Sequence, residues 1–492
     1  MIKSNSLYMK GLSLIVLLAI LPAALWAQVI RGQVFLDKNE NQTRDKGERG
    51  IRQVWVSNGA DMVQTDRKGY YSITAKPGQS IFPILPSDYT TSTKQAAQRG
   101  NAAFYYLDPQ LADLPTEVNF ALKAEKQAET FRIGAIGDVQ VDNQEEFSYA
   151  ARSILQELSQ REDLAFNIIL GDLVNNNMDL LAPLKSAFAG LPMPSWTLMG
   201  NHDRNVDHAG SMDDVFNRNF GADTYAFNYA QVHFIILNNI YATGRRSYEG
   251  RISEDQLEFL KNDLQQIDKE TTVVISQHIP MAQTRNKAEV LALLEGFKQV
   301  LFLSGHTHQI HRYSYENKAI HELGAGATCG TWWRGEKNAA GIPDALMQDG
   351  SPRGYFVVEF NQGDYRFRYK GVGLDAHKQM ALYTDSTKRK VIVNVYGGSA
   401  QTQVHMQIDS LDDITLERRR QVDPRVVQLV KRYKEKIYPT PGSTRIPLGN
   451  RPSSHIWEAM LPESLKPGMH KVIIRAEDAY GYQVSQVFFL EK

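Results

Sequence analysis

The chain has 492 residues, 22% of them charged, and a formal net charge of zero at neutral pH. This length allows several domains with a sizeable core, and the balanced charge gives no indication of a nucleic-acid partner or a charged tail. The single cysteine, Cys329, excludes an internal disulfide framework. We expect it to be a small buried side chain rather than a reactive thiol.

The first 27 residues have the pattern of a secretory signal peptide. Lys3 and Lys10 precede an apolar run from Leu12 to Leu21, and mostly small residues follow up to Ala27. The apolar run is shorter than the ~20 residues that a membrane-spanning helix needs. We therefore predict cleavage after Ala27 and a periplasmic or secreted protein with no membrane span after signal cleavage.

Residues 28 to 124 form a predicted N-terminal β-sandwich domain. Val29 to Phe35, Gln53 to Ser57 and Gly69 to Ile73 alternate apolar and polar residues between turn signals. The alternation is lost in Ala121 to Thr130, which we interpret as a linker into the next domain.

The segment after the first of these strands has the oxygen spacing of a calcium-binding loop. Side-chain oxygens fall at positions 1, 3, 5, 9 and 12 of a stretch that starts at residue 37, in Asp37, Asn39, Asn41, Asp45 and Glu48. The sixth position is Gln42 instead of the glycine of an EF-hand. The segment resembles calcium-binding loops of bacterial cell-surface β-sandwich repeats, which would add Ca as a cofactor. An Asx-rich turn without an ion explains the same residues, so both interpretations stay open.

Residues 127 to 372 contain five short apolar runs that each stop at a cluster of metal-ligating side chains. The runs are 131–136, 165–170, 196–199, 272–276 and 300–304. Such runs predict buried strands, and the helical patterns between several of them predict a mostly parallel, layered α/β domain. Because ligands bind beyond the carboxyl ends of strands in such sheets, the five clusters are expected to form one site.

The five clusters together offer oxygen and nitrogen ligands without a thiolate. They are Gly137 to Gln140, Gly171–Asp172, Gly200 to Asp203, Gln277–His278 and Gly305 to His308. This ligand set suits Mn, Zn or Fe better than Ca or a structural zinc site. The ligands are too many for one tetrahedral ion, and two divalent ions that share a bridging carboxylate would use them all.

The order of these clusters resembles the calcineurin-like metallophosphoesterase superfamily, whose blocks are D-x-H, G-D, G-N-H-D/E, H and G-H-x-H. The resemblance implies a four-layer α/β/β/α core that hydrolyses phosphate esters. It implies that Asp138, Gln140, Asp172 and His308 hold one metal. It also implies that Asp172, Asn201, His278 and His306 hold the other, so that Asp172 bridges the two. His202 would be the general acid at the leaving oxygen.

Two positions depart from the family pattern. Gln140 stands where the first block normally ends in His, and its neutral oxygen would weaken that metal site or change its ion. Asn175 stands where the second block often carries an Asp that orients the catalytic His. An Asn can orient His202 by a hydrogen bond, but it stabilises an imidazolium less well.

Four residues are candidates for the substrate pocket. Asn175 is one of them. Arg204 follows the third cluster and Arg312 the fifth, where each could clamp a phosphate group or form a surface ion pair. Trp332 follows the small-residue loop 324–331 and could offer an apolar wall to an organic leaving group, or pack against a neighbouring domain.

Residues 375 to 492 form a predicted C-terminal Ig-like β-sandwich without a catalytic constellation. Its strand-like segments are Lys390 to Tyr396, Gln403 to Ile408, His455 to Met460, His470 to Ala476 and Gln483 to Leu490. Asp423 and Pro424 predict the start of a short helix up to Tyr433.

The sequence therefore predicts an exported phosphoesterase in which a hydroxide held by two metal ions attacks phosphorus. The substrate would be a small-molecule or macromolecular phosphate ester, and no feature indicates a nucleic acid. A phosphodiesterase or nucleotidase with the same site is the narrower alternative. A catalytically weak surface binding protein is the alternative from another class, which Gln140 and Asn175 favour and the full set of histidines opposes.

Overall fold

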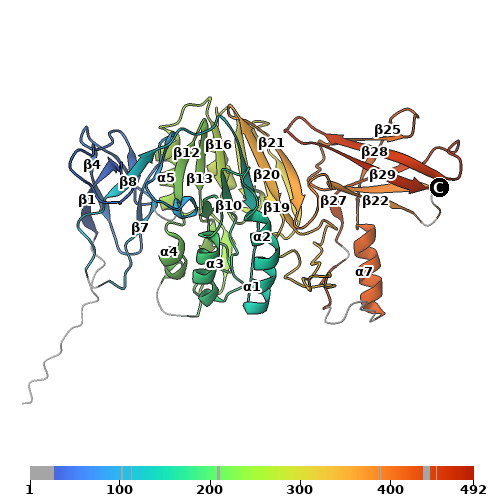
Figure 1. The fold of residues 1–492 in the computed structure, drawn as a ribbon, viewed down its shortest axis with the longest axis horizontal. Helices are drawn as coiled ribbons and strands as arrows, with labels where there is room; N and C mark the ends of the chain where they lie inside the picture. Colours follow the sequence, from blue (N-terminus) through green and yellow to red (C-terminus); the bar gives the residue numbers. More distant parts are fainter. Residues whose placement is uncertain are drawn as a thin grey trace, which may run out of the picture.

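The structure, a computed structural model, describes residues 27–100, 103–111, 113–207, 211–385, 387, 389–435, 444–449 and 451–492. Residues 1 to 26 of the predicted signal peptide lie outside the described residues. Within the described part of the chain, no helix has the length and apolar character that crossing a bilayer requires. Figure 1 shows three parts of the chain in a row, with the N-terminal strands in blue and the C-terminal strands in red.

The N-terminal part is a β-sandwich whose sheets have the strand orders β4-β1-β8-β6 and β3-β2-β5-β7. The strands are β1 (Gln28–Leu36), β2 (Trp55–Ser57), β3 (Met62–Gln64), β4 (Tyr70–Ala75), β5 (Ser80–Pro83), β6 (Tyr89–Thr91), β7 (Tyr105–Tyr106) and β8 (Phe120–Ala124). Alternate residues of β4 are buried, as expected for strands with one face on a core.

The strand β8 lies where the sequence predicted the start of a linker, so that prediction is wrong for residues 121 to 124. β8 pairs in parallel with β1 and antiparallel with β6. Phe120 and Leu122 are buried and alternate with partly exposed residues. Two buried positions are too few to show a period of two in the sequence.

The core consists of two mixed sheets, with the orders β11-β10-β9-β20-β21 and β12-β13-β16-β17-β19-β18 among the described residues. The first contains β9 (Thr130–Ile136), β10 (Phe166–Ile169), β11 (Ser195–Thr197), β20 (Gly354–Asn361) and β21 (Asp364–Gly371). The second contains β12 (Tyr225–Tyr229), β13 (Val232–Ile236), β16 (Thr272–Ser276), β17 (Val300–Ser304), β18 (Ile310–Ser314) and β19 (Ile320–Ala325). A small hairpin joins β14 (Ile240–Ala242) to β15 (Tyr248–Gly250).

Aromatic side chains hold the two core sheets face to face. The Phe166 ring from the first sheet lies 5.2 Å from Phe234 and 5.6 Å from Phe227 of the second, between ring centroids. These edge-to-face contacts bury large apolar areas between the sheets. The parallel strands β9, β10 and β11 and the parallel strands β13, β16, β17 and β19 therefore lie in two stacked layers.

Helices complete the predicted four-layer α/β/β/α order, which the structure confirms. The core helices are α1 (Gln144–Ala150), α2 (Gln156–Leu158), α3 (Leu181–Phe188), α4 (Asp214–Phe220), α5 (Glu254–Leu264) and α6 (Lys287–Leu293), and short 3-10 turns occupy Ala96–Gln98, Met178–Leu180 and Met281–Gln283. α3 contacts α4, and α5 contacts α6. A π-helical turn, η3 (Ala151–Leu155), separates α1 from α2.

The C-terminal part is a second β-sandwich, with the sheet orders β22-β23-β27-β26 and β25-β24-β28-β29. Its elements are β22 (Met380–Thr384), β23 (Lys390–Val395), β24 (Gln403–Ile408), β25 (Ile414–Thr415), β26 (Glu417–Gln421), α7 (Pro424–Lys434), β27 (Ser453–Met460), β28 (Met469–Glu477) and β29 (Gln483–Glu491). The Asp423 carboxylate accepts hydrogen bonds from the N–H groups of Arg425 and Val426, which confirms the predicted helix start.

Arg312 joins the core to this second sandwich. Its Nη1 lies 2.6 Å from Oδ2 of Asp478, and both side chains are buried. Neither of the interpretations from the sequence, a phosphate clamp or a surface ion pair, describes this contact. Arg312 is on β18 and Asp478 follows β28, so the ion pair ties two domains together.

Candidate metal centre

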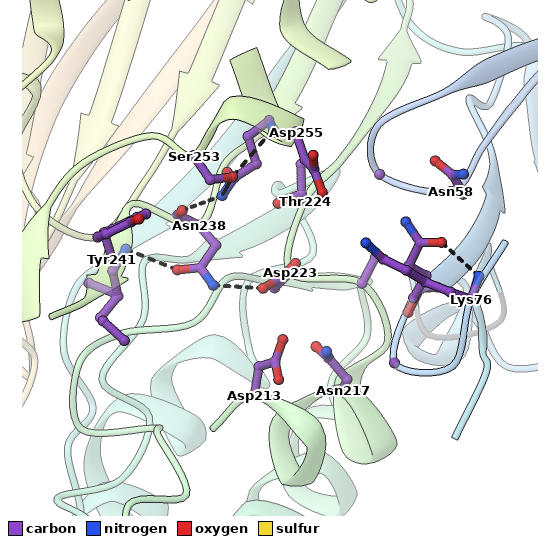
Figure 2. Close-up of a pocket in the computed structure, with 18 of the residues that line it drawn as sticks. Asn58, Lys76, Asp213, Asn217, Asp223, Thr224, Asn238, Tyr241, Ser253 and Asp255 are labelled. Atoms are coloured by element: carbon purple, nitrogen blue, oxygen red, sulfur yellow. Dashed lines mark hydrogen bonds between the residues drawn. The ribbon is translucent and has the colours of Figure 1, made fainter. Parts of the chain in front are cut away.

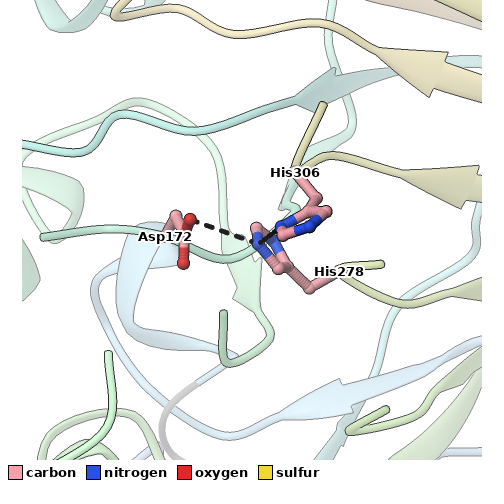
Figure 3. Close-up of side chains that lie close together, drawn as sticks. All are labelled: Asp172, His278 and His306. Atoms are coloured by element: carbon pink, nitrogen blue, oxygen red, sulfur yellow. Dashed lines mark hydrogen bonds and ion pairs between the residues drawn. The ribbon is translucent and has the colours of Figure 1, made fainter. Parts of the chain in front are cut away.

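The five predicted runs form β9, β10, β11, β16 and β17, and their polar clusters meet at one place beyond the carboxyl ends of these strands. Figure 3 shows Asp172, which follows β10, beside His278 and His306, which follow β16 and β17. Their ligand atoms all lie within 4.8 Å of one another. Residues that are far apart in the sequence thus converge because parallel strands from two layers end side by side.

The distances between these ligand atoms fit a bound ion. Nε2 of His278 lies 3.2 Å from Oδ2 of Asp172 and 3.2 Å from Nδ1 of His306. Oδ1 of Asn201 lies 3.1 Å from Nε2 of His278. Donor atoms that bind one ion at about 2.1 Å lie roughly 3 to 3.5 Å from each other. The predicted ligand group of Asp172, Asn201, His278 and His306 is therefore brought together.

The remaining predicted ligands lie beside this group. Nε2 of His308 lies 3.1 Å from Oδ2 of Asp138, and its Nδ1 lies 2.6 Å from the carbonyl oxygen of Gly330. A carbonyl only accepts, so Nδ1 carries the hydrogen and Nε2 is left to face Asp138. The side chain of Gln140 reaches the same place, because Sγ of Cys329 lies 3.7 Å from both Gln140 Oε1 and His308 Nδ1.

Backbone hydrogen bonds hold the two groups against each other. The N–H of His306 donates to both carboxylate oxygens of Asp138 at 3.1 Å. The N–H of Gln140 donates to the carbonyl of Asp172 at 2.8 Å. A Cβ on Gly200 would lie 2.1 Å from the nitrogen of Asp172, so only glycine allows this approach.

The predicted ligands share an unusual backbone conformation. Positive φ values occur at five of the seven, namely Asp138 (28°), Gln140 (40°), Asp172 (48°), His306 (71°) and His308 (50°). Such a conformation costs of order 1–3 kcal/mol for each non-glycine residue and persists only where the surroundings enforce it. The strain is concentrated where the side chains must converge.

The electrostatics of the group also favour a cation. Burial would raise the pKa of Asp172, but His278 lowers it below its usual range. Burial would lower the pKa of His278, but the Asp172 carboxylate raises it to about 9. Burial and the positive His278 lower the pKa of His306 to about 4. A buried carboxylate is thus balanced by one proton, which a metal ion would displace.

Two neighbouring residues organise the third cluster. The carboxylate of Asp203 accepts hydrogen bonds from the N–H groups of Leu173, Val174 and Gly200. Burial and the Asp172 carboxylate raise the pKa of Asp203 to about 7. The N–H of His202 donates to Oδ1 of Asp172 at 2.8 Å, which places the His202 ring at the edge of the ligand group.

Family models match three consecutive parts of the chain. The N terminal of calcineurin-like phosphoesterase matches residues 38–125, calcineurin-like phosphoesterase itself matches 131–310, and the C terminal of calcineurin-like phosphoesterase matches 322–483. The chain belongs to the calcineurin-like phosphoesterases. Members of this family are generally metal-dependent phosphoesterases, which agrees with the ligand group described above.

Solved structures align with this chain at low identity. A purple acid phosphatase from yellow lupin seeds aligns at 12% identity and a TM-score of 0.35, over 65% of this chain and 67% of its own. A predicted phosphoesterase from Streptococcus pneumoniae aligns at 14% identity and a TM-score of 0.25, over 49% of this chain and 90% of its own. A search of curated proteins gave no match.

The partner of the His202 ring is Asn176, not the predicted Asn175. Nδ1 of His202 lies 3.1 Å from Oδ1 of Asn176. Oδ1 of Asn175 instead accepts from Nε2 of Gln140 at 3.4 Å. The sequence cannot distinguish between adjacent asparagines in the run 175–177, because the backbone conformation determines which side chain faces the histidine.

Arg204 supports the loop that contains Arg245 and Ser247, and it is neither a surface ion pair nor a free phosphate clamp. Its buried guanidinium donates to the carbonyls of Arg245 at 2.6 Å and Ser247 at 3.3 Å. It also lies 5.4 Å from the ring centroid of Tyr248. Tyr248 faces His306 edge-on, with 6.4 Å between ring centroids, a contact that no sequence pattern indicated.

Trp332 lies directly against the predicted ligand His308, with 4.8 Å between ring centroids. The indole of Trp333 is buried and its Nε1 donates to the carbonyl of Val139 at 2.9 Å. Cys329 is buried as predicted, and burial raises its pKa, but the sequence missed that its sulfur contacts two candidate ligands. The loop that carries these residues forms one wall of the site.

The candidate calcium loop of the N-terminal domain is held together by its own hydrogen bonds. The Asp37 carboxylate accepts from the N–H groups of Glu40 and Gln42, each at 2.8 Å. Glu48 accepts from the N–H of Asp45 at 2.9 Å. The side chains of Asn39 and Asn41 both donate to Oδ2 of Asp45, at 2.7 and 2.8 Å. These contacts are of the Asx type, and calcium binding by the loop stays a prediction.

Proposed function

We propose that this phosphoesterase is an exported enzyme that hydrolyses phosphate esters with two divalent metal ions. The observation that carries the proposal is the convergence of Asp172, His278 and His306, together with Asn201, at distances that fit one ion. The adjacent group around Asp138 and His308 supports a second ion.

The ligands divide into two sets that share one carboxylate. Asp138, Gln140, Asp172 and His308 would hold one ion, and Asp172, Asn201, His278 and His306 would hold the other. Mn, Zn or Fe suits these oxygen and nitrogen donors. Bound divalent ions supply Lewis-acid stabilisation of phosphoryl oxygens and make water a stronger nucleophile at neutral pH.

His202 is the group of the chain that we assign to proton transfer. Its ring is half-buried at the edge of the ligand group, within reach of an incoming ester. Asn176 accepts a hydrogen bond from Nδ1–H, so Nε2 is the atom that points its proton toward the leaving oxygen. No protein base is required in this scheme, which agrees with the lack of an obvious candidate beside the ligands that the structure describes.

Two aromatic side chains favour an ester with an organic leaving group. Trp332 is 39% exposed beside His308, and Tyr248 is 37% exposed beside His306. Exposed rings beside His306 and His308 offer apolar contacts to such a group. A diester, a nucleotide and a simple monoester can each carry such a leaving group, and an activity screen distinguishes them.

The central experiment combines elemental analysis with an activity screen. The wild-type protein, loaded with Mn, Zn or Fe, is expected to cleave nitrophenyl phosphate or bis(nitrophenyl) phosphate and to lose this activity with a chelator. Asp172→Ala should lose both ions, because Asp172 belongs to both ligand sets. Asp179→Ala, at an exposed acid in the following 3-10 turn Met178–Leu180, serves as the control and should keep them.

Full metal content in Asp172→Ala would contradict the ligand assignment. A wild-type protein that binds two ions but cleaves neither ester class would instead be the catalytically weak binding protein. Nucleotides added to the screen distinguish a nucleotidase. Export is tested separately, by N-terminal sequencing of protein from the periplasm or medium, which should begin at Gln28.

A further inference from the structure

A buried arginine without a counter-ion lies between the core and the C-terminal sandwich. Arg353 is 6% exposed, and its Nη1 donates to Ser153 Oγ at 3.1 Å and to the carbonyl of Thr328 at 3.5 Å. Its guanidinium lies 5.2 Å from the ring centroid of Trp333. Among the described residues, no carboxylate forms an ion pair with it. A buried charge is costly unless it is paired, and an arginine does not lose its proton.

Arg353 lines a cavity of about 550 Å³ that has an excess of positive charge. The charged lining residues are Arg152, Arg353, Lys378, Arg425, Glu157 and Asp344. Both acids already have cationic partners, because Glu157 pairs with Lys370 at 2.8 Å and Asp344 pairs with Arg425. Arg152, Arg353 and Lys378 are left without an acid among the described residues, and of the three only Arg353 is buried, whereas Arg152 and Lys378 are exposed at the mouth of the cavity.

The charge and shape of the site select the kind of anion. A guanidinium presents parallel N–H donors that match the oxygens of a phosphate or a carboxylate. One buried and two exposed cations without acid partners suit a phosphoryl group, which carries about −1.5 to −2 charges at pH 7, better than a carboxylate with a single charge. The volume accommodates a small organic molecule as well as an inorganic ion.

We propose that this cavity binds a phosphoryl group, as inorganic phosphate or as a small phosphate ester, at a site separate from the metal centre. The N–H groups of Thr328 and Cys329 donate to the carbonyls of Gly137 and Asp138, at the end of β9. The carbonyl of Thr328 faces Arg353 instead. The metal centre and the cavity therefore contact the same loop, the first through the N–H groups of Thr328 and Cys329 and the second through the carbonyl of Thr328.

The local helix geometry is consistent with a binding site. Ser153, which accepts from Arg353, belongs to the π-helical turn η3. Such turns are rare and occur frequently at functional sites. Here the turn brings Ser153 Oγ into hydrogen-bond distance of the guanidinium while it still donates to the carbonyl of Tyr149 at 2.5 Å.

The test is isothermal titration of the metal-loaded, full-length protein with inorganic phosphate. Wild type is expected to bind two equivalents, one at the metal centre and one in the cavity. Arg353→Gln should lose one equivalent, and Asp172→Asn should lose the other. Arg334→Gln is the matched control, because Arg334 is an exposed arginine of the same loop that does not line the cavity. It should keep both equivalents.

Lys378→Gln covers the case in which Arg353→Gln does not fold, since the Lys378 side chain is exposed. It should weaken phosphate binding in the cavity severalfold in the Asp172→Asn background. In that background, competition by glycerol phosphate would identify an ester site, and its failure to compete would identify a site for free phosphate.

Unchanged binding in Lys378→Gln, or in a folded Arg353→Gln, would overturn the proposal. Acetate binding as tight as phosphate binding would overturn the choice of a phosphoryl group. The result is independent of the proposed function. If the metal centre binds no phosphate, wild type and Asp172→Asn should both bind one equivalent, and Arg353→Gln should bind none.

Discussion

Nδ1 of His202 lies 3.1 Å from Oδ1 of Asn176, and the N–H of Asn176 donates back to the carbonyl of His202 at 3.2 Å. The two residues thus fix each other's orientation beside Asp172. A neutral amide orients the ring but contributes less to a positive imidazolium than a carboxylate does. This arrangement makes Asn176 the positioning residue for proton transfer.

Asn176→Ala is expected to lower kcat by about tenfold, because a misoriented general acid loses part of its contribution. The measurement is steady-state kinetics on an ester that the wild type cleaves. Asn176→Asp restores an acceptor and should recover most of the activity. Asn177→Ala, whose side chain donates to the carbonyl of Asp142 instead, should change kcat little. Equal losses in the Asn176→Ala and Asn177→Ala variants would show a general loop defect.

His202→Ala should discriminate between leaving groups. An alkyl leaving group needs a proton, so its ester should be cleaved about 10²–10⁴-fold more slowly. Nitrophenolate is a stable anion, so hydrolysis of the nitrophenyl ester should fall much less. The ratio of kcat/KM for the two esters measures this difference. Equal losses on both would assign His202 to charge stabilisation or substrate binding instead of proton donation.

Gln140→His should strengthen the ion held with Asp138 and His308, because an imidazole replaces a neutral amide oxygen. We expect retention of that ion at roughly tenfold higher chelator concentration than in wild type. Elemental analysis after dialysis against graded chelator checks this. Gln160→His, at an exposed helix end, is the control and should leave metal content unchanged. A loss of metal in Gln140→His would mean that Cys329 leaves no room for the ring.

The ion pair between Arg312 and Asp478 should be important for stability. Asp478→Asn leaves a buried arginine without its partner and should lower the free energy of unfolding by about 3–5 kcal/mol. Asp413→Asn breaks the exposed pair with Arg475 and should cost at most about 1 kcal/mol. Denaturant titrations measure both. If both variants lower the free energy of unfolding by a similarly small amount, water reaches the pair between Arg312 and Asp478.

The same ion pair should make stability depend on pH. Burial would raise the pKa of Asp478, but Arg312 lowers it below the unfolded-state value of about 3.9. The pair therefore contributes stability at pH values above about 4, and this contribution is lost as the pH falls through the lower folded-state pKa. Thermal unfolding between pH 5 and pH 3 should show a smaller decrease for Asp478→Asn than for wild type.

Much of the fold was predictable because its signals are local. Buried strands show as continuous apolar runs, and the capped start of α7 shows as Asp423 followed by Pro424. Elements with weak or short sequence signals were not predicted. The strand β8 has only two buried positions, and α4 was not predicted from its seven residues. The segment has little strand signal of its own, and its pairing with β1, almost ninety residues away, stabilises it as a strand.

The sequence by itself determined the chemistry of the site: which carboxylates, amides and imidazoles follow the strands, and in what order. Only the tertiary structure decided their partners. It chose Asn176 over Asn175 for His202, buried Arg312 against a distant domain, and placed Tyr248 and Cys329 at the metal centre. Residue type sets what a side chain can bind, whereas the direction in which it points depends on backbone angles and on packing between segments far apart in the chain.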